Sequence, residues 1–215
     1  MGKICDWINR KRHNRGFGIQ SPSTFFFVTQ VLKEKLPYYV YPILEAIAHG
    51  KNHKAKHLKE LFRITNHYQP SNIISIGSHT AACALVAARP SVASFSIDAT
   101  PPSKAIHELL TGYNSKVQQG DITTLTKLAL KETRVAGMIY IGNCAERKEL
   151  LEAAIPYTDK NSIIVIEGIR SDKATQIWWK SVIEDQRTII TFDFYNTGML
   201  LFNKERFKQH YILKR

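Results

Sequence analysis

From residue 72 onward, short segments rich in β-forming residues alternate with segments long enough to be helices. The short segments are mostly apolar and occupy residues 73–76, 92–97, 116–119, 136–141 and 162–167. The helical segments occupy residues 80–89, 103–113, 122–131, 146–155 and 172–184. Apolar strands separated by helices are typical of a parallel sheet that is covered on both faces and has right-handed crossovers. The sequence therefore predicts an α/β fold.

The end of the chain departs from this alternation. "RTIITFDFY" and "GMLLFNKE" are two strand-like segments joined by "NT", with Gly198 following. This spacing predicts a β-hairpin in place of another strand–helix–strand unit. Dinucleotide-binding sheets do not end in such a hairpin, so the ending discriminates among the nucleotide-binding folds.

The first 70 residues predict helices only. "SPSTFFFVTQVLKEK" starts at a capping Ser or Thr, and two more helical segments are "YPILEAIAHG" and "KAKHLKELFRITNHY". We expect residues 1–69 to form a basic arm and helices that cover a site as a lid or build a homodimer. Residues 70–215 would form the α/β domain. Because residues 25–27 are all Phe, this helix should dock on the sheet domain or on a second subunit.

The positive charge is concentrated at the start of the chain. The formal net charge is +12, and residues 1–70 carry 12 Lys and Arg against 4 Asp and Glu. Such a region could meet RNA, an acidic protein or a membrane surface, or could simply be a solvated face. The sequence has no basic motifs flanked by aromatic residues, which disfavours nucleic-acid binding.

The remaining bulk features point to the cytoplasm. No apolar run approaches the length of a membrane span, and the N-terminus has no apolar core of a secretory signal. Cys5, Cys83 and Cys144 are odd in number and scattered along the chain. This pattern fits a reducing compartment and argues against disulfides or a structural zinc site.

A candidate ligand site follows the first predicted strand, at "IGSHTA". Gly77 allows a tight turn there, and the next helix offers free N–H groups. Asp98 lies 21 residues after Gly77, at the end of the second strand. A carboxylate in that place can accept hydrogen bonds from both ribose hydroxyls of an adenosine. This spacing fits NAD and S-adenosylmethionine equally well, although the glycine pattern G-x-G-x-x-G is absent.

The order of these motifs resembles the class I S-adenosylmethionine-dependent methyltransferases, and among them bacterial O-methyltransferase-like proteins. The motifs that carry the resemblance are "IISIGSHTA", "SFSIDATP", "QQGDI", "MIYIGN", "IVIEGIRSDKATQIWWKSV" and "TFDFYNTGMLLFNKE". The resemblance implies a Rossmann-like sheet of order 3-2-1-4-5-7-6, in which strand 7 is antiparallel. It also implies S-adenosylmethionine as the cofactor. Its site would be the loop of Gly77, Ser78 and His79, the ribose ligand Asp98, and an adenine border of Gly120, Asp121 and Ile122.

The chain departs from the family pattern at several site positions. Ser75 replaces an acid in the first strand, and Ala81 replaces a loop glycine. The fourth strand ends in Ile141 where Asp is common. Of the carboxylates that could hold a metal, only Glu167 remains, and one carboxylate does not make a Mg²⁺ site. We therefore expect no catalytic metal, with Glu167 as the candidate base and Asn143 as a polar positioning residue.

Two function classes remain open from the sequence. The first is a metal-independent methyltransferase that acts on a small molecule or an oxygen nucleophile, because methyl transfer depends chiefly on alignment of the reacting atoms. The second is a protein that keeps the fold, has lost catalysis, and binds a partner through its basic helical face. RNA methylation or RNA binding is a third and less favoured alternative.

Other candidate sites have simpler explanations. His49, His53 and His57 are spaced as metal ligands on one helix face, but Gly50 interrupts the helix and neighbouring lysines would repel a cation. A solvated basic face is the preferred interpretation. For Cys144 a buried inert thiol is preferred over a nucleophile. The G-x-S-x-G turn of a Ser-His-Asp hydrolase is absent.

Overall fold

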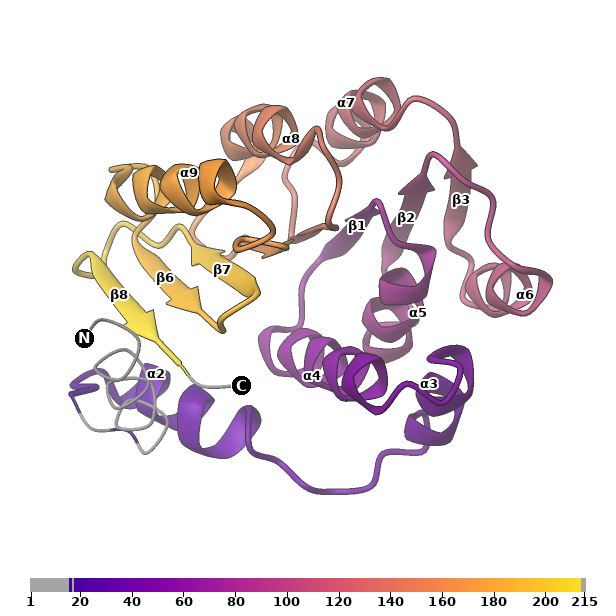
Figure 1. Cartoon of the computed structure of the whole chain (residues 1–215), viewed down its shortest axis with the longest axis horizontal. Helices are drawn as coiled ribbons and strands as arrows, with labels where there is room; N and C mark the ends of the chain where they lie inside the picture. Colours follow the sequence, from indigo (N-terminus) through magenta and orange to yellow (C-terminus); the bar gives the residue numbers. More distant parts are fainter. Residues whose placement is uncertain (1–15, 17, 214–215) are drawn as a thin grey trace.

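A mixed eight-stranded sheet forms the centre of the molecule (Figure 1). The structure is a computed structural model and describes residues 16 and 18–213. Most of the basic arm, with Cys5, lies outside this range. The strand order is β3-β2-β1-β4-β5-β7-β6-β8. The strands are β1 (Asn72–Ile76), β2 (Ala93–Asp98), β3 (Lys116–Gln119), β4 (Met138–Ile141), β5 (Ile163–Glu167), β6 (Ile190–Asp193), β7 (Thr197–Leu201) and β8 (Gln209–Ile212).

The predicted topology is confirmed. Strands β1 to β5 pair in parallel, and β7 pairs antiparallel with both β5 and β6. The sequence did not predict β8, which adds to the edge of the sheet parallel to β6. Its four residues, "QHYI", bury only Tyr211, so the segment lacks the apolar run that revealed the inner strands.

Helices cover both faces of the sheet. Figure 1 shows α7, α8 and α9 along one side of the sheet, and α4 with α5 on the other side. The helical segments are α2 (Pro22–Phe26), η1 (Phe27–Val31), α3 (Tyr41–Ile47), α4 (Asn52–Tyr68), α5 (His79–Ala88), α6 (Lys104–Gly112), α7 (Ile122–Thr133), α8 (Arg147–Ala154), η2 (Ile155–Tyr157) and α9 (Lys173–Glu184).

Successive residues of each inner strand enter different cores because side chains alternate across a strand. Ile73 and Tyr140 pack into the core shared with α4 and α5. Ile74 and Ile139 pack into the core shared with α7, α8 and α9. The inner strands are therefore buried on both faces, which explains why they appear in the sequence as continuous apolar runs.

The N-terminal helices share a core with the sheet. Ser21 caps α2, and the chain then passes into the π-helical turn η1. Phe27 is buried, and its ring lies 5.3 Å from that of Phe192 in β6, measured between centroids. Phe25 and Phe26 stay 44% and 53% exposed. The expected docking of this helix on the sheet domain thus takes place through one of the three rings.

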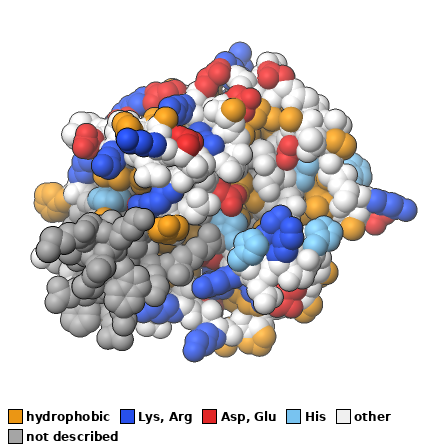
Figure 2. Space-filling model, viewed as in Figure 1, with side chains coloured by type: hydrophobic (Ala, Val, Ile, Leu, Met, Phe, Trp, Pro, Cys, Tyr) orange, Lys and Arg blue, Asp and Glu red, His pale blue; other side chains and the backbone are white. Residues whose placement is uncertain are grey.

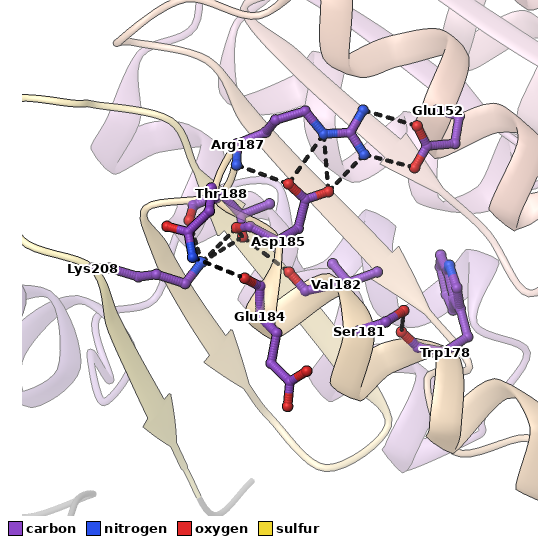
Figure 3. A network of polar contacts seen from close by, with 10 residues as sticks. Glu152, Trp178, Ser181, Val182, Glu184, Asp185, Arg187, Thr188 and Lys208 are labelled. Atoms are coloured by element: carbon purple, nitrogen blue, oxygen red, sulfur yellow. Dashed lines mark hydrogen bonds and ion pairs between the residues drawn. The ribbon is translucent and has the colours of Figure 1, made fainter.

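The C-terminal corner, which contains Asp185, Arg187 and Lys208, is tied together by polar contacts (Figure 3). The Arg187 guanidinium binds the carboxylates of Asp185 and Glu152. The Lys208 ammonium donates to the backbone carbonyl of Thr188 at 2.7 Å. These contacts join the end of α9 to the segment that leads into β8. Among the described residues, no helix is long and apolar enough to cross a membrane.

Candidate functional site

The carboxyl ends of β1 and β2 lie side by side and place Gly77 next to Asp98. Ile76 pairs with Ile97, and the Gly77 amide donates to the Ile97 carbonyl at 2.8 Å. Gly77 has a φ of +73°, in the left-handed region that favours glycine. The pairing that the sequence predicted between this turn and the acid of the second strand is therefore formed.

The first turn of α5 presents backbone N–H groups beside Gly77. Ser78 caps the helix, and its hydroxyl accepts from the Ala81 amide at 3.1 Å. The first N–H groups of a helix have no partner within the helix. They therefore attract a negatively charged group.

Asp98 is partly buried and holds one of its two carboxylate oxygens inside its own turn. Its Oδ1 accepts from the Thr100 amide at 3.1 Å and from the Thr100 hydroxyl at 3.2 Å. Within the described residues no donor is bonded to Oδ2. This oxygen can accept from a ligand.

His79, the first residue of α5, fills the space between that helix and β2. Its ring is buried, with Nδ1 2.6 Å from the Ser96 hydroxyl and Nε2 3.1 Å from the Thr100 carbonyl. Burial lowers the pKa of His79, which the nearby Asp98 partly offsets. Both ring nitrogens are thus engaged inside the protein.

The turn after β3 adjoins the carboxyl end of β2. The Gly120 amide donates to the Asp98 carbonyl at 3.2 Å, and Gly120 has a φ of +146°. Asp121 caps α7, where its carboxylate accepts from the Thr124 amide at 2.8 Å. Hydrogen bonds from Thr124 lower the pKa of Asp121. Ile122 is buried at the start of α7.

A second polar group lies where β4 and β5 end. The Tyr140 hydroxyl donates to Oε2 of Glu167. The other carboxylate oxygen, Oε1, lies 3.8 Å from Nε2 of His57 in α4. The His57 side chain is 12% exposed and that of Glu167 29%. His57 is therefore not part of a solvated face, unlike the exposed His49 and His53.

Several solved structures that share this architecture are methyltransferases. An S-adenosylhomocysteine-bound methyltransferase from Podospora anserina, PaMTH1, matches with a TM-score of 0.59 at 11% identity, over 90% of this chain and 96% of its own. CalS11, a TDP-rhamnose 3′-O-methyltransferase of calicheamicin biosynthesis, matches with a TM-score of 0.58 at 16% identity, over 88% and 99%. The chain has the class I methyltransferase fold.

A third structure, cofactor-bound Rv0187 from MTB, matches with a TM-score of 0.58 at 16% identity, over 84% of this chain and 95% of its own. No family model matches the sequence, and no curated protein matches it. Identities this low establish the fold alone. The expected sheet and the resemblance that implied it are therefore confirmed, while the roles of the site residues stay predictions.

The class I methyltransferase fold brings Asn143 close to the end of β5. A Cβ placed on Gly168 would overlap the Asn143 carboxamide. The buried Arg147 joins the same two loops, because it donates to the Cys144 carbonyl at 2.8 Å and to the Gly168 carbonyl at 2.6 Å. Asn143 itself is exposed. Its place beside Gly168 and Glu167 is compatible with a positioning role.

Side chains at and near the positions that depart from the family pattern make contacts within the protein. The Ser75 hydroxyl, in place of an acid, is buried and donates to the Ser78 carbonyl at 3.2 Å. Cys144 packs against Gly77, 3.8 Å from Sγ to the point where a Cβ would be. Burial raises the pKa of the Cys144 thiol, so it is protonated and a poor nucleophile. The described residues hold no group of three His, Cys, Asp or Glu side chains able to bind a metal.

Tyr140 and His57 were not predicted from the sequence as parts of the site. Tyr140 lies within an apolar strand, where it resembles any other core residue. His57 lies on a helix of the N-terminal region, and only the fold brings that helix to β4 and β5.

A cavity of about 630 Å³ lies at the opposite edge of the sheet, lined by residues such as Ser71, Gly137 and Ile163 at the starts of three strands. It is remote from all of these groups.

Proposed function

We propose that this protein is an S-adenosylmethionine-dependent methyltransferase that acts on a hydroxyl group of a small molecule. The observation that carries the proposal is the position of Gly77 and Asp98 at the adjacent carboxyl ends of β1 and β2, where Ile76 pairs with Ile97 and the Gly77 amide bonds the Ile97 carbonyl. The Oδ2 atom of Asp98 can accept from a ribose hydroxyl, and the first turn of α5 offers N–H groups to a carboxylate. Solved proteins of the same fold bind S-adenosylhomocysteine.

The remaining cofactor residues keep the roles that the resemblance implied. Gly77, Ser78 and His79 would form the loop beside the cofactor, and Gly120, Asp121 and Ile122 would border the adenine. When bound, S-adenosylmethionine supplies an electrophilic methyl group on a positively charged sulfur. The chain's own task is then to hold the acceptor in line with that group and to remove its proton.

Glu167 is the candidate proton acceptor. Tyr140 holds one carboxylate oxygen, and the other faces His57, so the carboxylate has a fixed direction. Its partial exposure would allow an acceptor hydroxyl to reach it. Asn143 would position the acceptor from the neighbouring loop. A general base placed in this way contributes about 10²–10⁴-fold to a rate.

We propose that the reaction uses no metal ion. The last residue of β4 is Ile141, and the residue after Glu167 at the end of β5 is Gly168. Neither supplies a carboxylate, so Glu167 has no acidic partner at these two positions. Calorimetry with Mg²⁺ should give no binding tighter than millimolar. Tighter binding would contradict this part of the proposal. A cytoplasmic location also stays a prediction, based on the scattered cysteines.

The cofactor proposal is tested by titrating the protein with S-adenosylhomocysteine in a calorimeter and by following its melting temperature. A ligand that binds only the native state raises this temperature. Asp98→Asn keeps an acceptor for Thr100 but loses the charge, and should weaken binding about ten- to a hundredfold. Glu108→Gln, an exposed carboxylate of α6, is the matched control and should leave the affinity unchanged.

A binding protein without catalysis is the second candidate, and one observation favours it. The loop carries Ala81 where the resemblance implies a glycine, and the side chains of Ala81 and of the neighbouring His79 are both buried. In that case no thermal shift would appear with S-adenosylmethionine at millimolar concentration. A partner would then meet the basic face of α4, which includes Lys51, Lys54 and Lys56. Figure 2 shows basic and His side chains close together on one face of the molecule. RNA binding would be recognised by a steep loss of affinity with salt.

A further inference from the structure

Four residues, Ser96, His79, Thr100 and Asp98, form a continuous hydrogen-bonded chain at the carboxyl end of β2. The Thr100 carbonyl can only accept a hydrogen bond, so Nε2 of His79 carries the proton in this contact. The other ring nitrogen, Nδ1, then accepts from the Ser96 hydroxyl. Thr100 in turn donates twice to Oδ1 of Asp98. The imidazole is thus linked to the carboxylate through one residue.

The two hydrogen bonds from Thr100 constrain the direction of the carboxylate. Both are made to Oδ1, and Oδ2 has no donor among the described residues. Thr100 is itself exposed and lies in a loop, and the buried ring holds its carbonyl. A glycine at position 79 would leave the Thr100 carbonyl and the buried Ser96 hydroxyl without these partners. An unpaired buried polar group is costly.

We propose that His79 is a positioning residue that orients Asp98 toward the ribose hydroxyls of the cofactor through Thr100. The inference rests on the proposed function, because it assumes a ligand that carries a ribose. It assigns His79 no direct contact with the ligand, since both ring nitrogens are bonded within the protein.

Two variants separate the hydrogen bond from the volume of the ring. His79→Phe keeps a ring of similar size and removes both nitrogens. His79→Gln places an amide N–H near the position of Nε2, so it can donate to the Thr100 carbonyl. We expect His79→Phe to weaken the binding of S-adenosylhomocysteine about tenfold, and His79→Gln to recover most of that loss.

The second ligand is 2′,3′-dideoxy-S-adenosylhomocysteine, which lacks the hydroxyls that Asp98 would bind. We expect His79→Phe to change its affinity less than about twofold, because a misdirected carboxylate costs nothing when no hydroxyl meets it. An equal loss for both ligands would mean general damage to the loop and would overturn the inference. Unchanged affinity of His79→Phe for S-adenosylhomocysteine would overturn it as well.

Failure of the proposed function has a different signature. If the wild-type protein binds neither ligand, the cofactor proposal is wrong and the inference falls with it. If the wild-type protein binds and the variants do not differ, only the inference is wrong. Hydrogen exchange of the Thr100 amide in the free protein gives a reading without ligand. We expect exchange about tenfold faster in His79→Phe than in His79→Gln, and equal rates would contradict the positioning role.

Discussion

The site at Gly77 and Asp98 and the C-terminal corner around Arg187 use polar groups in opposite ways. At the site the ring of His79 is buried and bonded to Ser96 and Thr100, and Thr100 binds one of the two carboxylate oxygens of Asp98. In the corner Arg187 is 47% exposed and its guanidinium is saturated by two carboxylates (Figure 3). At the site one carboxylate oxygen has no donor among the described residues and can accept from a ligand, whereas the Arg187 guanidinium is already bound to two carboxylates.

The same contrast concerns stability. Exposed ion pairs contribute little to the free energy of unfolding, because water screens them and long side chains lose entropy. The edge strands β6 and β8 that adjoin the corner should be held mainly by apolar contacts, because the ring of Phe192 packs against those of Phe27 and Tyr211. This can be tested by removing one kind of contact at a time.

The largest effect is expected from Phe27→Ala. Phe27 is 1% exposed and packs between α4 and β6, so its loss leaves a cavity and should cost about 3–5 kcal/mol of unfolding free energy. Phe26→Ala, in the same helical segment but 53% exposed, is the control and should cost less than about 1 kcal/mol. Urea denaturation measures both. Similar losses of unfolding free energy for the two variants would show that η1 does not anchor β6 through the packing of Phe27.

The next effect concerns an ion pair that is partly buried. The Arg170 guanidinium binds both carboxylate oxygens of Asp193, at 2.8 and 2.6 Å, and the Asp193 side chain is only 4% exposed. Arg170→Met removes both of these charged hydrogen bonds and should cost about 1.5–3 kcal/mol of unfolding free energy. Lys104→Met, which breaks an exposed pair with Glu108 at 3.9 Å, is the control. If both variants lose the same small amount of unfolding free energy, the buried ion pair is no stronger than the exposed one.

A smaller effect is expected from pH. Burial lowers the pKa of His79 below its ordinary value of 6.5, with a further lowering by His107 and opposing contributions from Asp98 and the Thr100 carbonyl. Below about pH 6.5 the unfolded chain therefore takes up a proton that the folded chain refuses, so stability falls as the pH is lowered. Above that pH the contribution of His79 is complete.

His79→Gln does not titrate and serves as the comparison. Urea denaturation at about pH 7.5 and about pH 5.5 should show a smaller loss on acidification for the variant than for the wild type. The difference between the two proteins is the relevant quantity, because His67, whose pKa burial also lowers, titrates in both. An identical loss of stability in the two proteins would show that the buried His79 imidazole is not held neutral.

The sequence predicted the sheet and the inner helices because burial on both faces leaves a continuous apolar pattern. It also predicted that Gly77 and Asp98 come together, since parallel strands end at one edge. It could not predict β8, where Tyr211 alone is buried, nor the pairing of His57 with Glu167, which depends on how α4 docks. The direction of the His79 ring is likewise a tertiary feature, fixed by Ser96 and Thr100.

The smallest effect is expected at Arg187. Arg187→Met removes contacts to Asp185 and Glu152, yet all three side chains reach solvent and should contribute less than about 1 kcal/mol together. Asp185→Asn, Glu152→Gln and the corresponding double variants with Arg187→Met would give each coupling energy by urea denaturation. Both couplings should shrink further in about 1 M salt, where charges at the surface are screened within about 3 Å. A coupling above about 2 kcal/mol would mean that these exposed ion pairs stabilise the corner substantially, and would remove the contrast with the site at Gly77 and Asp98.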